Sequence, residues 1–291
     1  MLPLDLVKLT PLLGRTTGRP EVRIGLIDGP VVMNHPELAS QHMREIGGNG
    51  GGHCTQAGSL ACTHGTFVAG ILSARRGSSA PAICPDCTLL LRPIFSEATS
   101  GQESMPSAKP EELAAAIIEC IAEGVHCINL SLALAQLSSK GEHELELALD
   151  HAAQRSVMIV AAAGNQSTLG SSAITRHPWV IPVVACNLQG RPLNESNLGN
   201  SIGKRGLCAP GDSITSLNAA GQSLTLGGTS VAVPFVTGVI ALLYSVFPTA
   251  TAAQIKLAIT QTSLSRRTSV VPPLLDAEAA YQILLTMNAR K

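Results

Sequence analysis

The segment that most constrains the fold is an uncharged run from Val231 to Val246, preceded by Gly227–Ser230. An apolar run of this length, with small residues spaced through it, predicts a deeply buried helix. Ser230 would lie at the start of that helix, where unpaired N–H groups and the positive end of the helix dipole face any negative charge that forms nearby. A loop that simply ends in a helix cap is the alternative interpretation.

Composition favours an α/β protein with a large buried sheet. The 291 residues are 45% hydrophobic and 14% charged, and no linker divides them, so we predict one domain over residues 1–291. Twenty basic residues balance twenty acidic ones, and aromatic residues make up 2%. The chain has no excess of basic residues and few aromatic residues on which bases could stack, which disfavours nucleic acid and membranes as partners. We predict no membrane-spanning stretch.

The N-terminal residues give an expectation about location. Asp5 and Lys8 interrupt the apolar pattern at the start of the chain, so no secretory signal is predicted. The expected location is therefore the cytoplasm. Met1–Thr17 is predicted to be a helical docking segment.

Apolar strands alternate with helices along the chain, which predicts a parallel sheet covered on both faces. The predicted strands are Val22–Ile27, Thr88–Ile94, Val125–Ser131, Val157–Ala162, Trp179–Ala185, Arg205–Ala209 and Ser223–Leu226. Besides the helix after Ser230, one helix is predicted to open at His64, and others cover Glu111–Glu123, His143–Gln154, Ala252–Thr262 and Ala277–Leu285.

Four polar residues lie at the ends of these elements: Asp28, His64, Asn165 and Ser230. Each has an ordinary interpretation when taken alone, such as a turn aspartate or a structural histidine. Together they suit acyl transfer. A serine nucleophile needs a neighbouring imidazole, the imidazole needs a carboxylate, and the oxyanion that forms needs N–H donors.

At these residues the chain resembles the subtilisin-like serine proteases. The motifs, in the family's order, are Ile27–Pro30 with His35–Pro36, His64–Gly70, Ala163–Asn165 and Gly228–Pro234. The resemblance implies a three-layer α/β/α fold with a mostly parallel sheet. It implies Asp28 as the residue that orients the histidine, His64 as general base and acid, Ser230 as nucleophile and Asn165 as oxyanion donor. We expect no cofactor, and no metal either, because no acidic cluster in the sequence suggests a high-affinity calcium loop.

The same resemblance implies that a strand end lines the peptide-binding cleft. The substrate-binding residues that it implies are Ser131, Leu132, Ala133, Ala162 and Gly164. Ala133 stands where a glycine is usual, so we expect its methyl group to narrow the specificity pocket and favour small residues before the scissile bond. Alternatively, Ala133 points away from the pocket and has no effect.

Within the family, Leu12–Pro20 followed by Ile27–Val31 is similar to the proteases that mature cyanobactins, which are ribosomal peptides trimmed and macrocyclised from precursors. The cyclising type carries a helical cap between its aspartate and histidine motifs, and only 35 residues separate Asp28 from His64. We therefore expect the type that removes the leader of a precursor peptide by hydrolysis. Relatives of that type have a further C-terminal domain, which leaves open that the natural chain extends beyond Lys291.

Two other functions stay open. One is a general intracellular subtilase for protein turnover, and the other is a catalytically inactive subtilase that binds peptides. An α/β-hydrolase is disfavoured, because no G-x-S-x-G elbow surrounds Ser230.

The eight cysteines allow two interpretations. Cys84 and Cys87 have the spacing of a redox motif without its βαβ context, and Cys54 and Cys62 are not spaced as a zinc knuckle. The four are either incidental or structural thiols, or one of the pairs Cys84–Cys87 and Cys54–Cys62 forms a disulfide.

Overall fold

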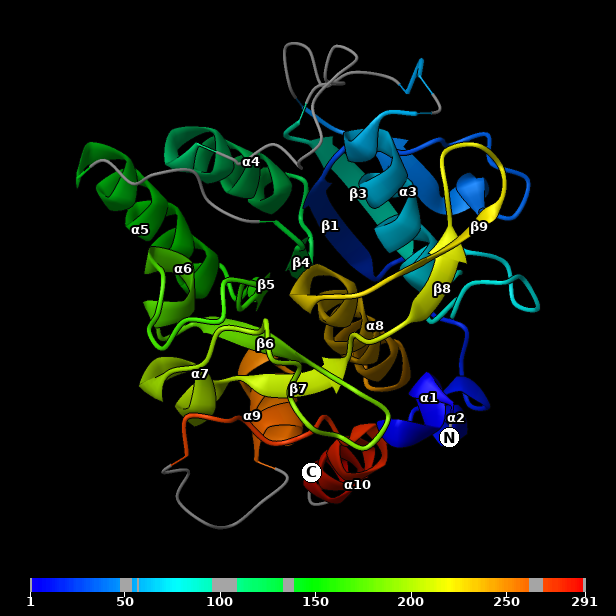
Figure 1. Ribbon diagram of the computed structural model, residues 1–291. Coiled ribbons are helices and arrows are strands. Elements are labelled where there is room, and N and C mark those ends of the chain that lie inside the picture. The colour runs from blue at the N-terminus through cyan, green and yellow to red at the C-terminus, as the bar shows by residue number, and fades with distance from the viewer. Residues whose placement is uncertain are drawn as a thin grey trace.

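The computed structural model describes residues 2–47, 54–56, 58–95, 109–132, 139–261 and 269–289. In these residues, seven parallel strands form one sheet in the order β2-β3-β1-β4-β5-β6-β7 (Figure 1). They are β1 (Arg23–Asp28), β2 (Met43–Glu45), β3 (Thr88–Pro93), β4 (Cys127–Leu130), β5 (Met158–Ala162), β6 (Val180–Cys186) and β7 (Leu207–Pro210). A separate antiparallel hairpin joins β8 (Ile214–Leu217) to β9 (Ser223–Leu226).

Helices cover both faces of the sheet. They are α1 (Pro3–Leu6), α2 (Thr10–Leu13), α3 (Leu60–Ser73), α4 (Pro110–Ala122), α5 (Ser139–Gln154), α6 (Ala173–Arg176), α7 (Asn200–Arg205), α8 (Thr229–Val246), α9 (Ala252–Thr260) and α10 (Ala277–Asn288). Successive strand residues point to opposite faces, so Leu26 and Val160 share a core with α3 and α8, whereas Ile27 and Ile159 share one with α4 and α5. The expected three-layer α/β/α fold is confirmed.

α8 is the central helix of one core, and it corrects an expectation. Its 18 residues have a mean hydropathy of 1.8, so within the described residues one helix is long and apolar enough to cross a membrane, contrary to the sequence-based prediction. However, 89% of these residues are buried in the protein, and the helix contacts β4, β5, β6 and β7. Packing against the sheet accounts for its apolar character.

The N-terminal docking segment is two short helices and not one. Lys8 takes the left-handed conformation (φ 51°), which an ordinary helix cannot contain, and Pro11 lacks the N–H that a continuing helix would use. The segment still packs on the domain, since Val7 and Leu12 are fully buried and α2 contacts α10.

Short elements differ most from prediction. The strand expected over Arg205–Ala209 starts at Leu207, because α7 continues to Arg205. β2 and β8 were not predicted, since three or four residues are too few to show a hydrophobic period.

Candidate active site

The carboxyl end of β1 places Asp28 against the imidazole of His64. Asp28 is the last residue of β1 and is fully buried. Its Oδ1 lies 2.7 Å from Nδ1 of His64 and accepts a hydrogen bond of 2.6 Å from the N–H of Gly29. Two side chains 36 residues apart in sequence are therefore held together by a charge-assisted contact.

Two glycines allow β1 and α3 to come this close. A Cβ atom on Gly29 would overlap the carbonyl oxygen of Ala61 in α3, and a Cβ atom on Gly65 would overlap the carbonyl oxygen of Gly29. Only glycine permits such contact between two backbones. The pairs Asp28-Gly29 and His64-Gly65 are thus explained by the packing of the helix on the strand end.

The carboxylate sets the proton affinity of the imidazole. Burial alone would lower the pKa of His64, but the charge of Asp28 and the hydrogen bond to its carboxylate outweigh burial, so the pKa is raised above its ordinary value. Because Nδ1 is held by Asp28, Nε2 is the nitrogen left to exchange a proton with another group.

α3 begins earlier than the sequence indicated. Its first residue is Leu60, so His64 lies in the second turn of the helix and not at its start. Ser59 caps the helix by accepting a 3.4 Å hydrogen bond from the N–H of Cys62. Cys62 is also bonded to Cys54, which ties the chain before α3 to the turn that precedes His64.

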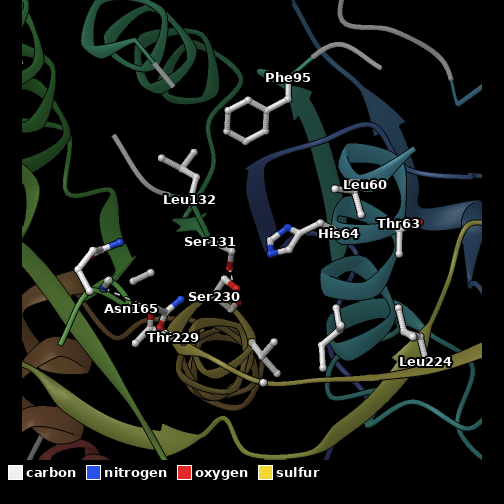
Figure 2. Close-up of a pocket in the computed structure, with 16 residues that line it drawn as sticks. Leu60, Thr63, His64, Phe95, Ser131, Leu132, Asn165, Leu224, Thr229 and Ser230 are labelled. Atoms are coloured by element: carbon white, nitrogen blue, oxygen red, sulfur yellow. Dashed lines mark hydrogen bonds between the residues drawn. The ribbon is translucent and has the colours of Figure 1, made fainter. Parts of the chain in front are cut away.

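Ser230 is the second residue of α8, directly after the turn at Gly228, whose φ is 113°. In the described chain its backbone N–H has no hydrogen-bond partner, as expected in the first turn of a helix. Ser230 and His64 line the same pocket, which has a volume of about 370 Å³ (Figure 2). Both residues are described, and no hydrogen bond joins their side chains. Such bonds are often long before substrate binds.

Asn165 uses the two ends of its amide differently. Its Oδ1 accepts a 2.9 Å hydrogen bond from the N–H of Thr229, which caps α8 where Gly228 has no side chain to do so. Figure 2 shows the amide nitrogen of Asn165 directed toward Ser230. The loop is further fixed by a 3.2 Å bond from the N–H of Gly164 to the hydroxyl of Thr229.

Four of the five predicted substrate-binding residues line this pocket: Ser131, Leu132, Ala162 and Gly164. Ala133 lies outside the described residues, so its effect on specificity stays a prediction.

Sequence reasoning missed the apolar lining of the pocket. Leu60, Phe95, Leu224, Leu226 and Val231 contribute to it. Two spacings in the sequence could have identified these lining residues. Leu60 precedes His64 by one helical turn, and Leu224 and Leu226 are two residues apart on β9 and therefore lie on the same face of that strand. The pocket is therefore suited to uncharged, apolar groups.

In the described residues, two of the cysteines form a disulfide and the others are free thiols. Cys54 and Cys62 form a disulfide, whereas Cys84 and Cys87 are free, which corrects the alternative pairing. Cys84 and Cys87 are both fully buried beside β3, and the thiol of Cys87 lies 3.8 Å from the hydroxyl of Ser245. Disulfides persist mainly in oxidising compartments, so the Cys54–Cys62 bond does not favour a cytoplasmic location.

The sheet order, the covering helices and this pocket agree with what comparison with known proteins shows. Residues 19–281 match the Subtilase family, so the chain belongs to that family of serine endopeptidases.

Individual relatives support the assignment. A thermostable alkaline protease of Halalkalibacterium halodurans is 33% identical over 201 residues, covering 69% of this chain and 52% of the relative. The chain thus spans about half the length of that protease. Among solved structures, the prenylagaramide maturation protease PagA matches with a TM-score of 0.81 and 26% identity, covering 95% of this chain and 98% of PagA. A serine-to-alanine mutant of the PatA protease domain matches with a TM-score of 0.80 and 28% identity, covering 93% of this chain and 97% of that domain.

Proposed function

We propose that this subtilase domain is a serine endopeptidase in which Asp28, His64 and Ser230 form the catalytic triad. The hydroxyl of Ser230 attacks the carbonyl carbon of a peptide bond while Nε2 of His64 takes its proton. Asp28 holds the imidazole and balances its positive charge. His64 then gives the proton to the leaving amine, and water hydrolyses the acyl-enzyme by the same proton exchange in reverse.

Two fixed N–H donors would stabilise the oxyanion of the tetrahedral intermediate. They are Nδ2 of Asn165 and the backbone N–H of Ser230, and neither needs to reorganise during the reaction. The observation that carries the proposal is the 2.7 Å contact between Asp28 and His64 at the pocket that Ser230 lines.

The proposed substrate is the precursor of a cyanobactin-type ribosomal peptide, from which the enzyme removes the leader. Two similar solved structures, PagA and the PatA protease domain, support this, because PagA is named a maturation protease.

The segment between Asp28 and His64 also supports leader removal by hydrolysis. In its described part, the regular structure before α3 is limited to a 3-10 turn over Ser40–His42 and β2. Because the described part of this segment contains no helical cap, we propose that water reaches the acyl-enzyme and hydrolyses it.

We propose the cytoplasm as the location, since a ribosomal precursor is synthesised there; the Cys54–Cys62 disulfide does not support this location. The apolar pocket lining supports a cleavage site flanked by uncharged residues.

Mass spectrometry of a candidate precursor incubated with the wild-type protein and with Ser230→Ala tests the proposal. We expect a free leader and a linear core-containing product with the wild type alone, and unfolded casein left mostly intact. Extensive digestion of casein would point to general protein turnover. A core product that is lighter than the linear core by the mass of one water would show ring closure. Cleavage by Ser230→Ala at the wild-type rate would show that Ser230 is not the nucleophile.

A further inference from the structure

The carbonyl oxygen of Ser230 lacks its normal helical partner. In an α-helix this oxygen accepts a hydrogen bond from the N–H four residues later, and here that residue is Pro234, which has no N–H. The hydroxyl of Ser131 supplies the missing donor at 2.7 Å. Figure 2 shows this bond as a dashed line between the two residues. A side chain from the end of β4 therefore completes the first turn of α8.

Ser131 is itself held by a buried chain of polar groups. Its hydroxyl accepts a 2.8 Å hydrogen bond from Nδ2 of Asn129, and Oδ1 of Asn129 accepts a 2.9 Å hydrogen bond from the hydroxyl of Thr237. Asn129 and Thr237 are fully buried, and Ser131 is 1% exposed. Because water cannot replace a lost partner at such sites, each bond depends on the next.

The groups that can only donate a hydrogen bond determine the direction of each bond in this network. Since Nδ2 of Asn129 donates to Ser131, the single hydroxyl proton of Ser131 is left for the carbonyl of Ser230. If the amide of Asn129 were reversed, Oδ1 would compete for that proton. The hydroxyl of Thr237 disfavours the reversal because it donates to Oδ1 at 2.9 Å, whereas its other acceptor, the carbonyl of Val233, lies farther away at 3.3 Å.

We propose that Thr237, Asn129 and Ser131 are positioning residues that fix the turn carrying Ser230 relative to the strand end that lines the pocket. Thr237 lies seven residues beyond Ser230, about 10 Å along the helix, and acts only through the other two. This inference rests on the proposed role of Ser230 as nucleophile.

The test measures the rate at which a small fluorophosphonate labels Ser230, with peptide mass spectrometry locating the label. Thr237→Val keeps the shape of the side chain and removes the donor. We expect the labelling rate and kcat to fall about 10-fold, with KM within about two-fold of the wild type. Thr237→Ser restores the hydroxyl and should recover most of the rate.

Ser245→Ala is the matched control. Ser245 lies on the same helix, is buried, and donates to the carbonyl of Ala241 at 2.8 Å. It should lower the melting temperature to a similar extent as Thr237→Val and leave the labelling rate unchanged. If Ser245→Ala and Thr237→Val slowed labelling of Ser230 equally, Thr237 would act only by stabilising the fold, and the inference would be overturned.

A second variant keeps the inference testable if Thr237→Val does not fold. Ser131→Ala removes the donor to Ser230 directly and should slow labelling at least as much. Adding Thr237→Val to Ser131→Ala, where the double variant folds, should slow labelling no further than Ser131→Ala alone does, because the residues act through one bond. Additive losses, or wild-type rates in Ser131→Ala, would overturn the inference. If the wild type is not labelled at Ser230, the proposed nucleophile itself is wrong and the positioning role fails with it.

Discussion

At the scale of single residues, the amide of Asn165 carries two functions that substitution can separate. Asn165→Asp keeps an oxygen for the N–H of Thr229 but has no N–H to donate. Asn165→Ala loses both. We expect kcat to fall about 10²–10³-fold in each variant. Stability should fall by about 1 kcal/mol in Asn165→Ala alone, because only that variant loses the helix cap.

Steady-state kinetics and thermal unfolding of the two variants check this prediction. If Asn165→Asp retained full activity, the side-chain N–H would not be an oxyanion donor.

Asp28 controls both the orientation and the pKa of His64. Asp28→Asn keeps the shape of the side chain but removes the charge that raises the pKa of the imidazole. We expect kcat to fall on the order of 10⁴-fold, the size found for this aspartate in a related protease. The acid limb of the pH–rate profile should move to lower pH, because burial continues to lower the pKa of His64 while the opposing charge is gone. A limb that stayed in place would show that another group titrates.

At the scale of elements, the close contact of α3 with β1 depends on glycine. Gly65→Ala would force a methyl group against the carbonyl oxygen of Gly29. We expect a loss of about 1–3 kcal/mol of unfolding free energy, together with lower activity because α3 carries His64. Urea denaturation of the variant measures the loss.

Gly58→Ala is the control for that substitution, since a Cβ atom at Gly58 would meet nothing within 4 Å. It should leave both stability and activity near those of the wild type. Equal effects at both positions would mean that crowding between α3 and β1 is not the cause.

At the scale of the whole molecule, the candidate site is linked to folding stability. The pKa of His64 is higher in the folded protein than its ordinary value of 6.5, so the folded state binds the proton more tightly than the unfolded state. The resulting stabilisation is fully present below pH 6.5 and is lost as pH rises through the folded-state pKa. Denaturation of the wild type and of His64→Ala across this window should show the slope in the wild type only. The same slope in His64→Ala would assign it to other groups.

The sequence predicted the parts of the molecule that have a strong local signal. The long apolar strands and the helix after Ser230 show clear periods, and Asp28, His64, Asn165 and Ser230 stand beside small residues at or near the ends of elements. Short elements such as β2 and β8 have no such signal. The choice of Cys54–Cys62 over Cys84–Cys87 also depends on which thiols the fold brings together, and spacing does not encode that.

The hydrogen-bond network from Thr237 to Ser131 could not be predicted from the sequence, for a related reason. In the sequence, Asn129 is one polar residue within a strand and Thr237 one hydroxyl within an apolar helix. Their roles depend on a contact between residues 108 positions apart and on the N–H that Pro234 lacks.

The central claim is that Asp28, His64 and Ser230 act as one unit, and the pH dependence of fluorophosphonate labelling tests it most directly. We predict a single label on the peptide that contains Ser230, with a rate that rises as His64 loses its proton and falls by orders of magnitude in His64→Ala. Labelling at another residue, or at the same rate in His64→Ala, would contradict the account.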